Sequence, residues 1–234
     1  MPTFADLQTA IRARDAARVR EILAVRPDLA ADRPHAGPSA LLLAAYMGGG
    51  EIAEALRGRV TMDSCEAAAL GALEELKQLL DEHPARTNAR SGDGWTPLHL
   101  AGFFGRREVA DLLLKRGASL TAISGGAEKN QPLHAALAGA CDPAIVRALV
   151  AHGADVNAVA AANYTPLHVA ASRGNEELVR FLVESGAGTD ARMDDGKTPA
   201  DLARDRGHPE TAKLLDTLAP SAGAPPTQPA RRHS

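Results

Sequence analysis

Large aromatic side chains are scarce in this sequence. Only 3% of its 234 residues are Phe, Trp or Tyr, although 45% are hydrophobic. Burial must therefore rest mainly on Ala and Leu, which suit thin helices that pack closely rather than a β-sandwich or a disordered chain. The composition favours an all-α fold.

Cysteine is equally rare. Cys65 and Cys141 are the only two, and they stand far apart, outside any C-x-x-C motif. Disulfide frameworks and zinc sites need more cysteines at shorter spacings. We expect two reduced, packed thiols and no cofactor.

Long hydrophobic runs and an excess of one charge are also missing. The longest uninterrupted apolar run, residues 40–47, is far shorter than the roughly 20 residues of a membrane-spanning helix. The first residues lack the basic and apolar segments of a secretion signal. The net charge is −3, which does not suit a nucleic-acid or anionic-membrane partner. We expect a cytoplasmic protein that binds neither. Its Arg-rich and Ala-rich usage is associated with GC-rich bacterial genomes.

What the sequence does contain is a repeated hexapeptide. Four clear copies start at Thr96, Gln131, Thr165 and Thr198, and each opens a helical pattern. Successive copies are 35, 34 and 33 residues apart. Self-similarity at nearly one period indicates stacked structural repeats.

Weaker copies start at Ala5, Ser39 and Met62. The sixth residue is alanine in every copy: Ala10, Ala44, Ala67, Ala101, Ala136, Ala170 and Ala203. A long aliphatic residue recurs in the second helical segment: Ile22, Leu56, Leu79, Leu113, Leu149, Leu182 and Leu215. Small side chains let helices approach to roughly 8–10 Å, so we expect each alanine at a helix crossing. The repeated alanine and the repeated aliphatic residue together predict seven helix–turn–helix units. These lie near residues 5–24, 39–57, 62–83, 96–116, 131–152, 165–185 and 198–218.

The segment Thr96-Pro97-Leu98-His99-Leu100-Ala101 resembles the ankyrin-repeat signature T-P-L-H-x-A. The resemblance covers residues 5–218 and is strong from residue 88 onward. It implies an ankyrin-repeat solenoid whose units are joined by β-hairpin-like fingers. It also implies protein–protein binding without chemistry of its own.

The histidines of the signature invite comparison with a metal site. In each unit Thr is suited to the N-cap and Pro to the first helical position, and His falls where its side chain can complete a capping box. Equivalent histidines of neighbouring units should lie roughly 8–10 Å apart. Zinc needs every ligand about 2 Å from one ion. We therefore expect His99, His134 and His168 to hold loops and expect no metal.

Two segments depart from the repeat. Only 23 residues separate the copies that start at Ser39 and Met62, about ten fewer than the period. The missing part is the finger, so residues 58–62 should form a tight link that leaves a gap in the finger row. Residues 219–234 are Pro-rich and Ala-rich, and we expect a disordered tail.

The resemblance implies that five of the seven aromatic residues fall on the surface that ankyrin repeats use for binding. Tyr46, Phe103 and Phe104 occupy variable positions of a first helix, and Trp95 and Tyr164 directly precede a Thr-Pro pair. Apolar and charged residues on the same surface complete the expected partner-binding set: Met47, Leu70, Leu100, Arg173, Arg192 and Lys197. An alternative stays open, in which Phe103 and Phe104 cover the joint between units and Trp95 clamps its own finger.

These observations predict a non-enzymatic protein-binding scaffold or regulator whose partner is another protein. A homo-oligomer formed through the apolar strip is an alternative. A dedicated inhibitor or accessory subunit of an enzyme is a second alternative. An enzyme is disfavoured, because neither a nucleophile elbow nor a pair of suitably spaced carboxylates is present.

Overall fold

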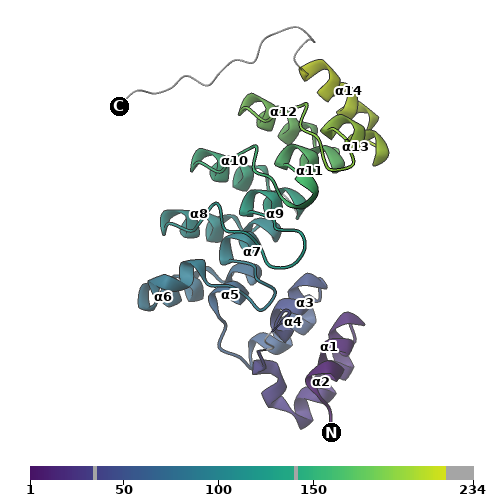
Figure 1. Ribbon diagram of the computed structural model, residues 1–234. Coiled ribbons are helices and arrows are strands. Elements are labelled where there is room, and N and C mark those ends of the chain that lie inside the picture. Colours follow the sequence, from purple (N-terminus) through teal and green to yellow (C-terminus); the bar gives the residue numbers. More distant parts are fainter. Residues whose placement is uncertain (34–35, 140–141, 220–234) are drawn as a thin grey trace.

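The computed structural model describes residues 1–33, 36–139 and 142–219, which form an elongated stack of short helices (Figure 1). Within these residues there are fourteen α-helices, three 3-10 helices and no β-strand. The chain is therefore all-helical, as the composition predicts. The expected tail from residue 220 onward and Cys141 lie outside the described residues.

The α-helices come in consecutive pairs. The first helices are α1 (Phe4–Arg12), α3 (Ala40–Tyr46), α5 (Ser64–Leu70), α7 (Pro97–Phe103), α9 (Pro132–Ala138), α11 (Pro166–Ser172) and α13 (Pro199–Asp205). The second helices are α2 (Ala16–Val25), α4 (Gly50–Arg57), α6 (Leu73–Glu82), α8 (Arg107–Lys115), α10 (Pro143–Ala151), α12 (Glu176–Glu184) and α14 (Pro209–Leu218). The 3-10 helices η1 (Pro27–Ala31), η2 (Pro84–Asn88) and η3 (Ala161–Asn163) lie in connections between pairs.

The two kinds of helix form two layers. Each first helix packs on the second helix of its pair, and successive first helices contact one another along the whole stack. In Figure 1 the second helices α6, α8, α10 and α12 lie on the left, and the fingers project on the opposite side of the first helices. The face made by the first helices and the fingers is called here the inner face.

Capping boxes set the starts of the first helices. In α7 the Thr96 side chain caps the helix while His99 reaches back to the Thr96 amide, as the sequence predicts. All the first helices except α3 carry this arrangement. In two helices the capping residue is not the first residue of the expected repeat copy. Thr3 caps α1, where the copy was expected to start at Ala5, and Asp63 caps α5, where it was expected to start at Met62. Both residues accept a backbone hydrogen bond that Ala5 and Met62 have no side-chain oxygen to accept.

The repeated alanines are buried at helix crossings. All seven, from Ala10 to Ala203, are at most 5% exposed, which confirms their expected role. The repeated aliphatic residues of the second helices are at most 1% exposed at every position except Leu79, which is partly exposed. Cys65 is a free, buried thiol, as expected.

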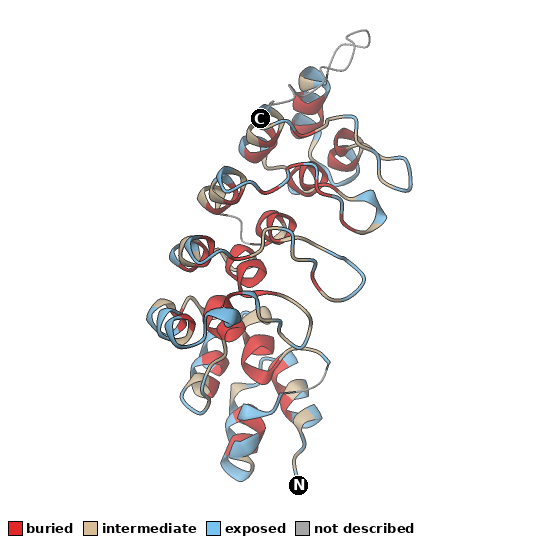
Figure 2. Cartoon of the chain, turned by 60° about the vertical axis from the view of Figure 1, so that its left-hand side comes forward, coloured by how far each residue is buried: buried red, intermediate tan, exposed pale blue. Residues whose placement is uncertain are grey.

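The buried apolar residues form two clusters. One joins α1–α4, from Leu7 to Leu56, and the other runs from Cys65 to Leu215 and also takes in Leu42. Figure 2 shows buried residues on the sides of the helices that face one another. The boundary between the clusters falls close to the short link of residues 58–63.

Candidate functional site

The fingers form a row joined by backbone hydrogen bonds. The amide of Gly125 donates to the carbonyl of Gly94 at 3.1 Å, and the amide of Asp194 donates to the carbonyl of Ala162 at 3.1 Å. The fingers are tight turns in which, for example, the Ser91 amide bonds the Trp95 carbonyl at 2.9 Å. Since residues 1–33, 36–139 and 142–219 contain no regular strand, the expected β-hairpin form stays a prediction.

The expected gap in the finger row is wrong. Residues 58–63 do form a short link, but the amide of Gly37 donates to the carbonyl of Gly92 at 3.0 Å. The connection after α2 therefore bonds directly to the finger that precedes α7. Shortening the chain by one finger brings the neighbouring fingers together, and the opening appears among the second helices instead.

Glu66 holds the two sides of the link together. It takes the capping-box place that His99 has in α7, and it is 1% exposed. Its carboxylate accepts from the Ser39 hydroxyl at 2.6 Å, from the Arg33 guanidinium at 2.9 Å and from the Asp63 amide at 2.9 Å. Burial, more than any other cause, raises the pKa of Glu66. Two of these donors, Ser39 and Arg33, connect α5 to the segment before α3, and the third belongs to the N-cap of α5 itself.

The histidines have the structural role that was predicted. His99 is fully buried; its Nδ1 lies 2.8 Å from the Thr96 hydroxyl and its Nε2 lies 2.9 Å from the Asn130 carbonyl. A carbonyl can only accept, so Nε2 carries the proton and Nδ1 accepts. Burial lowers the pKa of His99 to about 4, which keeps the ring neutral at ordinary pH.

The same contacts recur in the next two units. His134 Nε2 lies 3.2 Å from the Tyr164 carbonyl, and His168 Nε2 lies 3.2 Å from the Lys197 carbonyl. Each imidazole thus connects the start of its own helix to the end of the following finger. In the part of the chain that the structure describes, no group of three or more His, Cys, Asp or Glu residues is placed to hold a metal ion.

Four of the predicted site residues form one aromatic cluster, made of Tyr46, Trp95, Phe103 and Phe104. The ring centroids of Tyr46 and Phe104 are 5.5 Å apart, those of Trp95 and Phe103 5.5 Å, and those of Phe103 and Phe104 5.2 Å. The last two pairs meet edge to face, a favourable arrangement of ring quadrupoles. All four rings are partly exposed on the inner face.

The sequence of α5 makes this cluster possible. Helix α5 lies between α3 and α7, and three of its residues, 67–69, are alanines. With no large side chain in that stretch, Tyr46 of α3 reaches the rings of α7. The Tyr46 hydroxyl donates to Asp93 Oδ2 at 2.9 Å, and burial together with this carboxylate raises the pKa of the phenol. The cluster is therefore fixed to the finger and still partly exposed.

The remaining apolar candidates divide into three cases. Met47 and Leu70 are partly exposed and pack against the buried cluster of α1–α4; Met47 directly follows Tyr46, and Leu70 lines a hollow together with Phe104. Leu100 is fully buried, so its placement on the binding strip was wrong. The position following the histidine faces the neighbouring helices, as Val169 also shows with 5% exposure. Tyr164 lies outside the cluster, stacked on a histidine of its own unit.

The predicted charged residues already have partners within the chain. Arg173 donates to the carbonyl of Gly139 at 3.0 Å, and Arg192 donates to that of Gly196 at 2.8 Å. Lys197 pairs with two carboxylates, Asp195 at 3.3 Å and Asp205 at 3.0 Å. These contacts brace the fingers and the joints between units. Each of the three cations also keeps some exposure to solvent.

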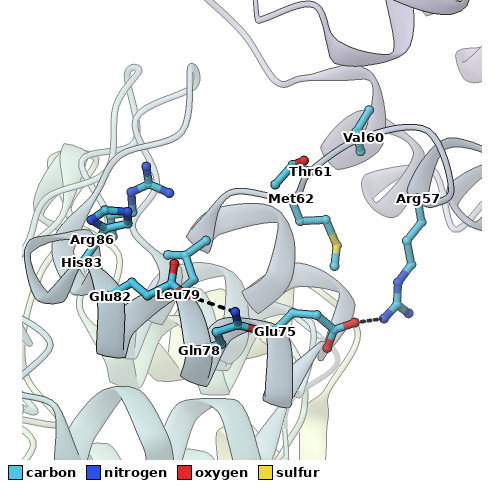
Figure 3. A pocket seen from close by; sticks show the side chains of 10 residues that line it. All are labelled: Arg57, Val60, Thr61, Met62, Glu75, Gln78, Leu79, Glu82, His83 and Arg86. Atoms are coloured by element: carbon cyan, nitrogen blue, oxygen red, sulfur yellow. Dashed lines mark hydrogen bonds and ion pairs between the residues drawn. The ribbon is translucent and has the colours of Figure 1, made fainter.

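One cavity was not foreseen. It has a volume of about 540 Å³ and lies between the end of α4, the short link and α6 (Figure 3). Its walls include Val60 and Met62 from the link and Leu79 from α6. The short spacing between the second and third copies was the available signal, but it was interpreted as a missing finger on the other layer.

None of the helices in the described ranges is both long enough and apolar enough to cross a bilayer.

A family model of ankyrin repeats in three copies matches residues 64–160 and 133–221. The B-cell lymphoma 3 protein homolog of Mus musculus is 31% identical over 111 residues, which cover 47% of this chain and 24% of that protein. The human oxysterol-binding protein-related protein 1 is 38% identical over 63 residues, covering 23% of this chain and 7% of that protein. The human ankyrin repeat and SAM domain-containing protein 3 is 34% identical over 61 residues, covering 26% and 9%.

The chain thus spans at most 24% of the length of these relatives. They do not test the bacterial source that residue usage suggested. The two matches to the family model together extend over more than half of the chain. With its stacked helix pairs, capping histidines and bonded fingers, this chain belongs to the ankyrin-repeat family.

Proposed function

We propose that this chain is a non-enzymatic, protein-binding scaffold or regulator that holds another protein against its inner face. Ankyrin repeats in general mediate protein–protein interaction. The observation that supports a site here is the aromatic cluster, which gathers Tyr46, Trp95, Phe103 and Phe104 on one partly exposed surface of an otherwise aromatic-poor chain.

The physical state of the cluster suits an anchor for a partner. Aromatic residues are enriched among the residues whose truncation costs an interface roughly 2 kcal/mol or more. The rings already pack on one another, and the Tyr46 hydroxyl is tied to Asp93. A side chain that is ordered before binding loses little conformational entropy when the complex forms. Packing between units and partner binding are then compatible roles for the same rings.

The neighbouring residues extend the proposed surface. Met47, which directly follows Tyr46, and Leu70, which lines a hollow with Phe104, add partly exposed apolar area. Arg173, Arg192 and Lys197 lie farther along the stack and supply charge that can orient a partner. Because these three are already bonded within the chain, we assign them to orientation rather than to most of the affinity.

The family match begins at residue 64, and helices α1–α4 precede it. We include them in the same ankyrin domain as two divergent units, which makes seven units over residues 1–218. In α3, Ser39 caps the helix without a capping box. The polar exposed face of α2 is suited to a terminal unit, because an end repeat must keep one face in water. A cytoplasmic location is part of the same proposal.

The test is to capture a partner from the source organism with the tagged chain, purify it and measure its affinity. Met47→Glu places a charge beside the cluster without removing a ring, and Trp95→Ala removes one. Phe181→Ala is the control, because this ring lies on α12 under Arg147 of α10, away from the cluster. We expect at least a tenfold loss of affinity with the first two variants and none with the control. Equal affinities for all three folded variants would refute the site.

If the partner is an enzyme, its activity with and without the chain distinguishes a scaffold from an inhibitor.

A further inference from the structure

The cavity between α4 and α6 marks a place where the layer of second helices is interrupted. The repeated aliphatic position of the second helices is at most 1% exposed in α2, α4, α8, α10, α12 and α14. In α6 the same position is Leu79, which is partly exposed. Because the link is short, α4 does not cover Leu79. Among the described residues, the only ion pair across the cavity joins Arg57 to Glu75.

The cavity has apolar residues on both sides, Val60 and Met62 on the link and Leu79 on α6, among lining residues that are mostly polar or charged. Figure 3 shows Met62 of the link extending toward α6, from which Leu79 projects, while Val60 lies farther along the link. All three side chains are partly exposed. The volume of about 540 Å³ lies within the range of roughly 300–1,000 Å³ of ligand-binding clefts. It is large enough to accept several aliphatic side chains at once.

The rim along α6 is acidic. Glu75 and Glu82 line the cavity, and Glu74 and Asp81 border the adjoining outer surface of the same helix, where Lys77 is the one cation. All four carboxylates are exposed. The arginines of the cavity stand at its two ends, Arg57 at the end of α4 and Arg86 in η2 (Figure 3).

We propose that this cavity is a second docking site, in which a short amphipathic helix of a partner protein, with an apolar stripe and basic flanks, packs along α6. The repeat itself indicates the shape of the occupant, because second helices lie side by side elsewhere in this layer, as α6, α8 and α10 do. Glu75 and Asp81 already pair with Arg57 and Arg116, so the exposed carboxylates of Glu74 and Glu82 indicate its charge. This site lies on the opposite layer from the inner face, so it goes beyond the function proposed above.

The occupant has a recognisable sequence pattern. Apolar residues at i, i+3, i+4 and i+7 would enter the cavity and contact Leu79, Val60 and Met62. Lys or Arg residues beside that stripe would lie against Glu74 and Glu82. An acidic helix would meet like charge along α6 and bind less tightly.

The experiment uses the full chain and a fluorescein-labelled peptide of about four helical turns, with Leu at those positions and Lys and Ala elsewhere. Two control peptides have the same composition in scrambled order and Glu in place of Lys. We expect anisotropy to report saturable binding of the first peptide and at least tenfold weaker binding of both controls. Doubling the salt should weaken the binding, since exposed charges contribute to it.

Variants then locate the site. Gln78→Trp fills the cavity from its exposed rim, and Leu79→Asp places a charge on its floor. Lys115→Trp puts the same ring on an exposed position of α8 as the matched control. We expect at least a tenfold loss with the first two variants and none with the third, at unchanged helicity. Because Gln78 is exposed, the proposal stays testable even if Leu79→Asp fails to fold.

Other outcomes would overturn the proposal. Absent binding, or binding that the cavity variants leave unchanged, rules out the site. Binding that appears only after residues 220–234 are removed means that the chain's own end occupies it. Dimerisation in sedimentation experiments that Gln78→Trp abolishes would make a second copy the occupant. Loss of partner binding with Trp95→Ala has no bearing on this peptide, so the two proposals fail independently.

Discussion

The hydroxyl of Tyr46 on α3 donates a 2.9 Å hydrogen bond to the carboxylate of Asp93, which lies in the finger that precedes α7. This bond passes over α5 and joins the units on either side of the short link. It is part-buried, and Asp93 also accepts from Ser91.

Removing the hydroxyl should therefore weaken the stack. We expect Tyr46→Phe to lower the free energy of unfolding by about 1.5 kcal/mol, since hydrogen bonds to charged groups contribute roughly 1.5–3 kcal/mol. Urea unfolding followed by circular dichroism measures it. Tyr164→Phe, which loses a bond to the Ser172 hydroxyl, is the control and should cost about 0.5–1 kcal/mol. A Tyr46→Phe midpoint equal to that of the wild type would contradict this role.

The buried histidines should make stability depend on pH. His99 has a folded pKa of about 4 against an ordinary 6.5, so the unfolded chain binds its proton first as pH falls. Stability is then full above pH 6.5 and is lost between pH 6.5 and 4, by roughly 3 kcal/mol from this residue. The pKa values of His134 and His168 are lowered in the same direction.

His99→Gln tests this assignment. Glutamine keeps polar atoms near Thr96 but does not titrate, so the variant should be less stable at pH 7 and lose less on acidification. Unfolding midpoints at several pH values between 7 and 4 give the comparison. Parallel curves for variant and wild type would exclude His99 as a source of the dependence.

Glu66 should be the most costly carboxylate to remove. Glu66→Ala leaves the Ser39 hydroxyl, the Asp63 amide and the Arg33 guanidinium without their acceptor. We expect a loss of about 2–3 kcal/mol, because buried polar groups without partners are expensive. Glu75→Ala, which removes an exposed partner of Arg57, should cost less than about 1 kcal/mol. If the two variants unfold at the same denaturant concentration, Glu66 does not join the two sides of the link.

The raised pKa of Glu66 makes its contribution to the stability of the fold change with pH in the opposite direction from that of the histidines. Its folded pKa is raised, so the folded chain binds the proton first and gains stability as pH falls through that value. Glu66→Gln removes this gain while keeping an acceptor for Ser39. The acid limb of the stability curve should therefore fall more steeply in Glu66→Gln than in the wild type.

The fingers cross too closely to admit a side chain. A Cβ on Gly125 would lie 2.5 Å from the Asp93 carbonyl oxygen and 2.9 Å from the Gly94 Cα. Both neighbours are backbone, so we expect Gly125→Ala to cost about 1–3 kcal/mol through overpacking. Gly58 has a helical φ of −68° and nothing within 4 Å, and Gly58→Ala should be neutral or stabilise by about 0.4–1 kcal/mol. Thermal melts of the two variants decide whether the finger row tolerates any addition.

Much of the fold follows from local sequence signals. The period locates the helix pairs, because a capping residue, a first-turn proline and a small residue at the crossing each act within a few neighbours. The role of His99 follows as well, since both of its partners lie within one repeat and the start of the next. Leu100 was predicted on the inner face but is buried. On so short a helix, residues that are adjacent in the sequence can belong to the inner face and to the buried face.

The features that depend on two or more units were harder to predict. The bond from Gly37 to Gly92 and the reach of Tyr46 over α5 arise from the way a shortened link repositions whole helices. The cavity beside Leu79 has the same origin. The spacing of the copies showed that a segment is missing, but not on which layer of the stack the space would open.

The division of the apolar interior into two clusters has a consequence for cooperativity. In a linear stack each unit is stabilised only by its nearest neighbours, so the whole behaves as one folding unit only if every interface is strong. At the boundary after α4, a cavity and a set of polar contacts replace part of the apolar packing. Helices α1–α4 should therefore open and close as a separate cooperative unit, with amide hydrogens that exchange before those of α7–α12.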